Sequence, residues 1–256
     1  MDTVQALVIC LESRRKDRCD VNFDSYRSVF PRAQRMVAVD ATNISMRDPR
    51  ISAFARQHIT SGVDVDYLHV ASRGAVGCYL SHMECWRRCV DSQQPCVVIE
   101  DDMYFDTRKK NMLTEAYNSI PKDAEFASLI YIPMSSGGTC ADGWCTISAR
   151  TFAGTQCYYI TPTGAQKLLR QALPMITHVD VYISYLGADD PDFKAYRYEK
   201  KIYGTFEFLR DHMTSSIGHA PQVKKLLPES NWFYGSWSVL TLLLIVTTAV
   251  LVFHKK

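Results

Sequence analysis

Three adjacent carboxylates, Glu100, Asp101 and Asp102, directly follow the apolar run Val97–Ile99. A continuous apolar run predicts a strand that is buried on both faces. In α/β proteins, ligands bind just beyond the carboxyl ends of such strands. Because three neighbouring carboxylates repel one another, a divalent cation would stabilise them, and carboxylate oxygens are the ligands that Mg²⁺ and Mn²⁺ prefer. The alternative interpretation is a strand that runs into a solvated acidic turn.

Composition and charge fit a globular protein of one large domain or two small ones. The chain has 256 residues, of which 47% are hydrophobic, and this allows a sizeable core. The formal net charge is +2 and there is no long basic block, so nothing predicts nucleic-acid binding through phosphate contacts. The chain contains neither a GxGxxG fingerprint nor a P-loop, so neither of these nucleotide-binding motifs is available.

Apolar runs and helical patterns alternate along the first half of the chain, which predicts βαβ units and a largely parallel sheet. The predicted strands are Ala6–Leu11, Arg35–Asp40, Val97–Ile99, Ala127–Ile132 and Thr155–Thr161. The predicted helices are one that ends near Phe30, before Pro31, and those at Ile51–Ile59, Cys78–Val90, Lys109–Ser119 and Ala165–Leu173. A glycine-rich loop is expected at Ser135–Gly143, and a second group of polar residues lies within Thr177–Leu186.

The run from Trp237 to Phe253 carries no charge. At about 1.5 Å per residue, a helix of this length spans roughly 26 Å, slightly short of a typical hydrocarbon core. Aromatic residues precede the run and His254–Lys256 follow it, and both kinds of residue anchor helices at membrane interfaces. We therefore expect a transmembrane helix at 237–253, with a buried core helix as the alternative.

The cellular compartment is predicted from the N-terminus and the cysteines. The N-terminus lacks a signal-peptide pattern, because Asp2 is acidic and the apolar stretch Ala6–Leu11 is too short. We therefore expect the residues before the helix at 237–253 to face the cytosol, with a luminal orientation as the alternative. The nine cysteines contain no CxxC pair, and we expect them to act as small apolar residues rather than in disulfides or a zinc site.

Four segments carry a resemblance to a known family. They are ALVICLESRRKDR from Ala6, RMVAVDA from Arg35, GAVGCYLSHMECWRRCVDSQQPCVVIEDDMYF from Gly74, and CYYITPTGAQKLL from Cys157 followed by HVDVYI from His178. In this order and spacing they resemble glycosyltransferase family 25, which includes bacterial lipooligosaccharide galactosyltransferases and procollagen galactosyltransferases. The central block of about thirty residues is the most specific part. The resemblance covers roughly Ala6 to Ile217 and excludes the uncharged run near the end.

The resemblance implies an α/β fold that is GT-A-like (Rossmann-like), with a mixed, mostly parallel sheet flanked by helices. The expected organisation is a glycosyltransferase domain at 1–220, a juxtamembrane linker at 221–236, the transmembrane helix at 237–253 and a short basic tail at 254–256. The implied reaction is metal-dependent transfer of a hexose, galactose or glucose, from a UDP-sugar to a hydroxyl acceptor on a protein, lipid or glycan, with inversion at the anomeric carbon.

The acidic triplet stands where the resemblance places the Asp-x-Asp element of GT-A enzymes. A divalent ion there, Mn²⁺ or Mg²⁺, would stabilise the departing diphosphate as a Lewis acid. If the segment were extended, Glu100 and Asp102 would share one orientation and Asp101 would face the other way. We expect Asp102 to be the direct metal ligand, with Glu100 or Asp101 reaching the ribose or a metal-bound water.

Five further residues are candidate donor contacts. Arg14 and Arg18 offer planar, permanently charged groups suited to phosphate, whereas their alternative is a solvated helix start. Asp40 could accept a hydrogen bond from the uracil or ribose, or it could cap a turn. Ser81 and His82 belong to the matching Ser-His pair on the predicted helix; His82 could donate to the phosphate or sugar, and its alternative is a structural histidine.

An inverting transfer needs a general base for the acceptor hydroxyl. Asp180 is the candidate, and Asp189 and Asp190 are its rivals; any of them could equally lie in a solvated turn.

Two other functions compete with the transferase. One is a metal-dependent phosphohydrolase, which would need a second group of metal ligands. The other is a tail-anchored interaction protein with weak catalysis on a glycosyltransferase fold.

Overall fold

In the computed structural model, all of the described residues lie in the unit Met1–Ala220. The described residues are 1, 3–61, 70, 72–103, 105, 110–133, 137–148 and 152–199. The predicted linker at 221–236, the predicted transmembrane helix at 237–253 and the basic tail at 254–256 all lie outside the described residues. Among the residues that are described, no helix is long and apolar enough to cross a membrane.

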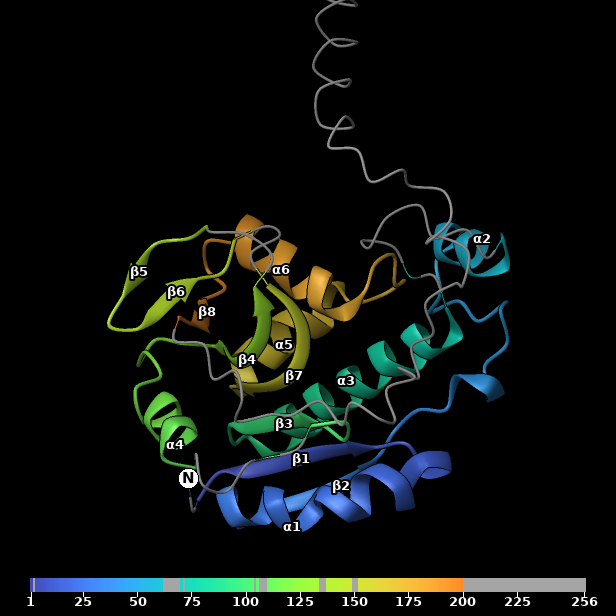
Figure 1. Cartoon of the computed structure of the whole chain (residues 1–256). Helices are drawn as coiled ribbons and strands as arrows, with labels where there is room; N and C mark the ends of the chain where they lie inside the picture. Colours follow the sequence, from blue (N-terminus) through green and yellow to red (C-terminus); the bar gives the residue numbers. More distant parts are fainter. Residues whose placement is uncertain are drawn as a thin grey trace, which may run out of the picture. The chain divides into compact units, whose positions relative to one another are not determined.

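An eight-stranded sheet forms the centre of the described part, in the order β2-β1-β3-β7-β4-β8-β6-β5 (Figure 1). The strands are β1 (Gln5–Cys10), β2 (Ala33–Val37), β3 (Cys96–Glu100), β4 (Phe126–Pro133), β5 (Cys140–Ala141), β6 (Trp144–Thr146), β7 (Phe152–Ile160) and β8 (Ala195–Tyr198). β1 is parallel to β2 and β3, and β4 is parallel to β8. The other neighbouring pairs are antiparallel: β3–β7, β7–β4, β6–β8 and β5–β6.

The mixed α/β class is confirmed, but the expectation of a mostly parallel sheet is wrong for the described strands. β7 lies between β3 and β4 and is antiparallel to both. From Thr155 to Tyr158 every residue of β7 is buried. A central antiparallel strand that is covered on both faces has the continuous burial typical of a parallel strand, so its direction cannot be predicted from its apolar pattern.

Helices cover both faces of the sheet, which gives a three-layer arrangement (Figure 1). The helices are α1 (Asp20–Val29), α2 (Ala53–Ser61), α3 (Arg73–Ser92), α4 (Lys110–Asn118), α5 (Pro162–Gln171) and α6 (Val179–Asp189). Short helical turns occur at Glu12–Arg14, Arg15–Cys19 and Ala41–Asn43. Side chains alternate along β3, so that Val98 packs with α3, α5 and α6, whereas Val97 and Ile99 pack with α1 and α4.

Helix α3 packs closely against the chain segment that follows β2. A Cβ atom on Gly77 would lie 2.6 Å from the carbonyl oxygen of Val39, so this approach requires glycine. One turn later, the Ser81 hydroxyl accepts the Val39 N–H at 2.8 Å and donates to the Gly77 carbonyl at 2.7 Å. Gly77 and Ser81 therefore fix α3 in place, and His82, the next residue, takes its position from this packing.

The cysteine expectation is wrong for four residues. Cys10 and Cys19 form one disulfide, and Cys140 and Cys145 form another across the β5–β6 hairpin, where they are paired in register. The expected loop at Ser135–Gly143 instead contains strand β5, so the hairpin and its disulfide differ from the sequence expectation. The five free cysteines do act as small apolar groups: Cys85, Cys89, Cys96 and Cys157 are buried and Cys78 is half-buried.

Candidate functional site

The acidic triplet lies at the carboxyl end of β3, beside the end of the parallel strand β1. β3 ends at Glu100, and Asp101 and Asp102 form a turn. The strand alternation that predicted one shared orientation for Glu100 and Asp102 therefore does not continue through the triplet. The Leu11 N–H, just after β1, donates to Asp101 Oδ2 at 3.1 Å. This bond ties the turn to the neighbouring strand.

Helix α1 holds the backbone of the acidic turn from the other side. The Asn22 amide donates to the Asp101 carbonyl at 3.4 Å. The Tyr26 hydroxyl contacts the carbonyl oxygens of Glu100 and Met103. Sequence analysis did not single out Asn22 or Tyr26. The signal was available, since two polar residues four apart share one face of a helix that is otherwise buried there.

Burial and mutual repulsion raise the pKa values of the two turn carboxyls. Burial raises the pKa of Asp101 to about 6, although the Leu11 N–H and the charges of Arg18 and Arg14 act in the opposite direction. Burial also raises the pKa of Asp102 to about 7, and the charges of Glu100 and Asp101 add to this. The turn therefore concentrates negative charge in a place where water cannot fully solvate it.

Glu100 differs from its neighbours because hydrogen bonds stabilise its ionised form. Burial acts to raise the pKa of this carboxyl, but bonds from His82 and Thr155 outweigh it and the net shift is downward. His82 Nε2 lies 3.3 Å from Glu100 Oε1, and the Thr155 hydroxyl donates to the same oxygen at 2.7 Å. His82 is fully buried, so the structure places it behind Glu100. Thr155 was not predicted, although a polar residue in an apolar strand is a recognisable signal.

Two unpaired buried atoms fit the groups that a sugar-nucleotide site would hold. Asp102 Oδ1 and Arg14 Nε are buried and have no hydrogen-bond partner among the described residues. An unpaired carboxylate oxygen within a repelling cluster suits a divalent cation. An unpaired guanidinium N–H suits a phosphate oxygen. Arg18 is also buried, and its charge lowers the pKa values of both Asp101 and Asp102. The predicted Arg14, Arg18 and acidic triplet are therefore brought together.

Asp40 and Ser81 have local structural partners instead. Asp40 Oδ1 accepts the Thr42 N–H at 2.9 Å and the Thr42 hydroxyl at 2.7 Å, which lower its pKa and correspond to the turn-cap alternative. The Ser81 hydroxyl is buried and bonded to the backbone of Val39 and Gly77. No described contact joins either side chain to the acidic turn.

Asp180 lies in the first turn of α6 and is bound to β7. Its Oδ2 accepts the Gly154 N–H at 2.6 Å, and its Oδ1 accepts the Val181 N–H at 2.8 Å. Burial and nearby carboxylates raise the pKa of the Cys78 thiol. Those carboxylates are Glu100, Asp180 and Asp102, so the charge of Asp180 acts on the same region as the triplet.

Asp189 and Asp190 lie at the opposite end of α6 from Asp180. Nine residues of helix correspond to about 14 Å, at about 1.5 Å per residue. Asp190 Oδ1 accepts the Asp192 N–H at 2.9 Å, which matches the solvated-turn alternative. Of the three candidate bases, Asp180 is the one that the fold brings toward the acidic turn.

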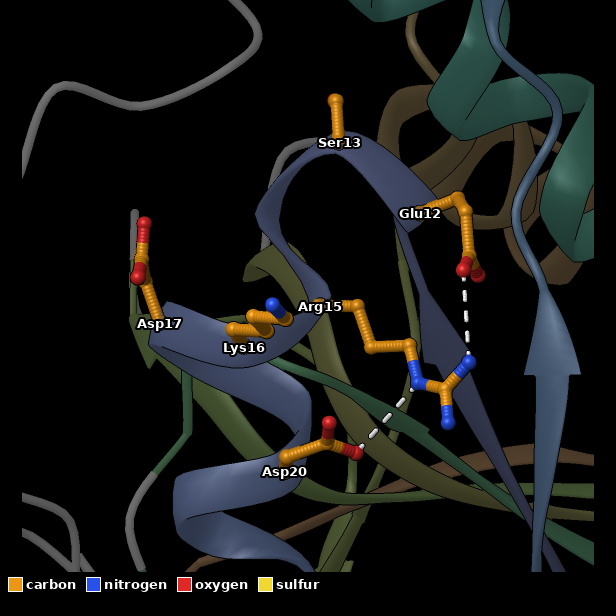
Figure 2. A pocket seen from close by; sticks show the side chains of 6 residues that line it. All are labelled: Glu12, Ser13, Arg15, Lys16, Asp17 and Asp20. Atoms are coloured by element: carbon orange, nitrogen blue, oxygen red, sulfur yellow. Dashed lines mark hydrogen bonds and ion pairs between the residues drawn. The ribbon is translucent and has the colours of Figure 1, made fainter.

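A separate surface pocket lies beside the segment that carries Arg14 and Arg18 (Figure 2). Its lining residues are Glu12, Ser13, Arg15, Lys16, Asp17 and Asp20. Arg15 reaches across it to Glu12 at 3.2 Å and Asp20 at 3.4 Å (Figure 2). These ion pairs are exposed, as is Lys16, so Arg15 and Lys16 lie at a solvated helix start.

Most of the acidic-turn site falls within a segment that matches a known family. The family model described as glycosyltransferase family 25 (LPS biosynthesis protein) matches residues 4–135, more than half of the 256-residue chain. The chain belongs to glycosyltransferase family 25. The family predicted from the sequence is thus confirmed. The family 25 segment contains β1 to β4, Arg14, Arg18 and the acidic triplet, whereas Thr155 and Asp180 lie after it.

The relatives of this family 25 chain are longer proteins. Procollagen galactosyltransferase 2 from Mus musculus is 28% identical over 121 residues, 46% of this chain and 19% of the relative. A glycosyltransferase 25 family member from Aedes aegypti is 25% identical over 187 residues, 70% of this chain and 30% of the relative. Another, from Anopheles gambiae, is 28% identical over 166 residues, 60% of this chain and 27% of the relative. The chain spans less than a third of the length of these relatives.

The raised pKa of Asp102 predicts a pH-dependent effect of its substitution on stability. A carboxyl with a folded pKa of about 7 and an ordinary value of 3.8 binds more protons in the folded state between these limits. It therefore lowers the free energy of unfolding as pH rises from about 4 to 7. Asp102→Asn should avoid this loss and stabilise the protein at pH 8 by roughly 1–4 kcal/mol, with little effect near pH 4.

Urea unfolding at the two pH values, in the presence of a chelator, measures this difference. Asp91→Asn, at an exposed position on α3, is the control and should change neither value. Equal stabilities of the wild type and Asp102→Asn at pH 8 would contradict the electrostatic description of the turn.

Proposed function

We propose that the protein is a metal-dependent glycosyltransferase that moves a hexose from a UDP-sugar to a hydroxyl acceptor, with inversion. The acidic turn after β3 carries this proposal, because Asp102 Oδ1 is buried without a hydrogen-bond partner among the described residues, and the charges of Arg14 and Arg18 act on the same turn. Relatives named as procollagen galactosyltransferases support galactose as the transferred sugar, with glucose as the alternative. A GT-A-like fold is part of the proposal, since the acidic turn follows a central strand of a mixed sheet.

The triplet and the two arginines would divide the work of binding the donor. Asp102 and Glu100 would hold a divalent ion, Mn²⁺ or Mg²⁺, which supplies Lewis-acid stabilisation of the leaving diphosphate. Arg14 and Arg18 would bind phosphate oxygens through charge-assisted hydrogen bonds. Asp101 is held by the Leu11 N–H, and its remaining acceptor positions would face the ribose or a metal-bound water.

Asp180 would accept the proton of the acceptor hydroxyl. Each of its oxygens already accepts one backbone N–H, and each retains a further lone pair for the acceptor. These two bonds fix the direction of the carboxylate. Asp189 and Asp190 remain rivals only if the acceptor binds at the other end of α6.

We also propose that the uncharged run at 237–253 anchors the protein in a membrane, with the domain at 1–220 in the lumen. Two disulfides favour the luminal alternative over the cytosolic orientation expected from the N-terminus, since disulfides persist in oxidising compartments. The acceptor would then be a hydroxyl on a luminal protein, lipid or glycan.

Replacement of Asp102 tests the central proposal. Asp102→Asn should lower the transfer rate by at least ~100-fold, because it removes charge that stabilises the transition state through the cation. Hexose transfer from a panel of UDP-sugars, assayed with Mn²⁺ and with a chelator, provides the measurement, with Asp91→Asn as the matched control. Full turnover of the variant, or of the wild type in chelator, would refute the metal-dependent mechanism. Release of UMP and sugar 1-phosphate in place of sugar transfer would favour the phosphohydrolase.

Replacement of Asp180 separates acceptor chemistry from donor binding. We expect Asp180→Asn to lower kcat by roughly 10²–10⁴-fold, as for loss of a general base, with little change in UDP-sugar affinity. Donor titration and steady-state kinetics measure the two effects. A loss of donor affinity at unchanged kcat would make Asp180 a donor-site or structural residue.

Orientation can be measured on sealed microsomes. The luminal proposal predicts that added protease leaves the domain intact until detergent opens the vesicles. Digestion before detergent is added would instead place the domain in the cytosol.

A further inference from the structure

A chain of hydrogen bonds leads from the core to Glu100. The Trp86 indole N–H donates to the Tyr158 hydroxyl at 2.9 Å, and that hydroxyl lies 2.9 Å from His82 Nδ1. The other ring nitrogen, His82 Nε2, lies 3.3 Å from Glu100 Oε1 and 3.2 Å from Thr155 Oγ1, and the Thr155 hydroxyl donates to the same Glu100 oxygen. Trp86, Tyr158 and His82 are fully buried, whereas the Glu100 side chain is 19% exposed. The chain therefore runs from the interior to the accessible site.

The donor and acceptor of each bond can be assigned from chemistry. An indole nitrogen can only donate, so the Tyr158 oxygen is the acceptor from Trp86. Tyr158 is fully buried, and the hydrogen-bond acceptor within reach of its own proton among the described residues is His82 Nδ1. His82 then carries a ring proton on Nε2. This proton faces Glu100 Oε1, which as a carboxylate oxygen can only accept, and Thr155 Oγ1, whose own proton is directed at Glu100.

Helix α3, which packs on one face of β3, and strand β7, which pairs with β3, supply the other residues of this hydrogen-bond chain. Trp86 and His82 lie four residues apart on one face of α3. Tyr158 and Thr155 come from β7, where Tyr158 is paired with Val98 of β3. Glu100 lies two residues after Val98 and therefore on the same face of β3. The position of the Glu100 carboxylate thus depends on the packing of α3 and β7 together.

A metal site on the same residues is the competing interpretation. One ligand atom each from Cys78, His82 and Glu100 lies within 4.8 Å of the others. Such a set would suit zinc if His82 Nε2 offered a lone pair. The bond from Trp86 to Tyr158 argues against this, because it leaves the ring proton on Nε2.

We propose that His82 is a positioning residue, which Trp86 and Tyr158 hold as the neutral Nε2–H tautomer so that it fixes the Glu100 carboxylate beside the acidic turn. The idea that Glu100 is oriented toward a cation and its sugar nucleotide rests on the proposed function. The hydrogen-bond chain itself does not depend on that function.

Nitrogen-15 NMR of the histidine-labelled full chain at pH 7.5 tests the tautomer directly. The chain has seven histidines, and His82→Gln identifies the signals of His82. We expect a protonated Nε2 and an unprotonated Nδ1 in the wild type, and loss of this single tautomer in Tyr158→Phe. Tyr159→Phe, at the next position on β7 and outside the chain of bonds, should keep it. An Nδ1–H tautomer in the wild type would overturn the proposal.

Binding of Mn²⁺ in the presence of UDP tests the positioning of Glu100. Residues that hydrogen-bond to a metal ligand change metal affinity by about 10–100-fold, as His82 would for Glu100. Loss of the Tyr158 hydroxyl, which holds His82, should therefore weaken binding by roughly 10-fold. In a Glu100→Gln background the same change should have less than about a twofold effect, since coupled residues are not additive. His82→Gln, which keeps an N–H donor, should bind more tightly than His82→Leu. Equal losses from Tyr158→Phe in both backgrounds would mean that Tyr158 acts only through the fold.

Titration with Co²⁺ tests the competing interpretation, a metal site formed by Cys78, His82 and Glu100. A thiolate-to-cobalt absorption band that disappears in Cys78→Ser but not in Cys157→Ser would establish the metal site and overturn the positioning role.

Failure of the proposed function gives a different result. If the wild type binds no Mn²⁺ and transfers no sugar, the NMR measurement still accepts or rejects the hydrogen-bond chain.

Discussion

Repulsion among three carboxylates at the buried end of β3 is the constraint to which the surrounding structure responds. Asp101 and Asp102 have raised pKa values because they are buried beside like charges. The Leu11 N–H and the two nearby arginines reduce this cost, and Asn22 and Tyr26 of α1 hold the backbone of the turn. Within the described part of the chain, Asp102 Oδ1 still has no hydrogen-bond partner. An arrangement that is unfavourable by itself is typical of sites that need a ligand to complete them.

The sequence carried enough information to predict the central part of this site. The apolar run before the triplet predicts β3, and the pattern around Ser81 and His82 predicts the helix beside it. Arg14 and Arg18 follow a buried strand that neighbours β3, so a shared sheet edge brings them to the triplet. These predictions succeed because they depend on periodicity within a segment and on the common edge of parallel strands.

The predictions that failed depend on how distant segments pair. β7 is antiparallel between β3 and β4, and its buried residues have the same pattern in either direction. Thr155 and Tyr158 reach the site only through that pairing. The disulfides depend on local geometry instead. Cys10 and Cys19, nine residues apart, meet through the helical turns between them, and Cys140 and Cys145, five residues apart, meet through the register of a hairpin. Asp40 and Ser81 were predicted to contact the donor. Their side chains instead accept hydrogen bonds from nearby backbone N–H groups, those of Thr42 and Val39.

The bonds of Asp180 join the first turn of α6 to β7. Gly154 has a φ of +83° and directs its N–H at Asp180 Oδ2. A carboxylate that takes a proton becomes a weaker acceptor, so protonated Asp180 would hold Gly154 and the first turn of α6 less firmly. If Asp180 is the base, each catalytic cycle briefly loosens this contact. Acceptor release and the return of the proton to solvent would then share one local motion, next to Thr155, which bonds to Glu100.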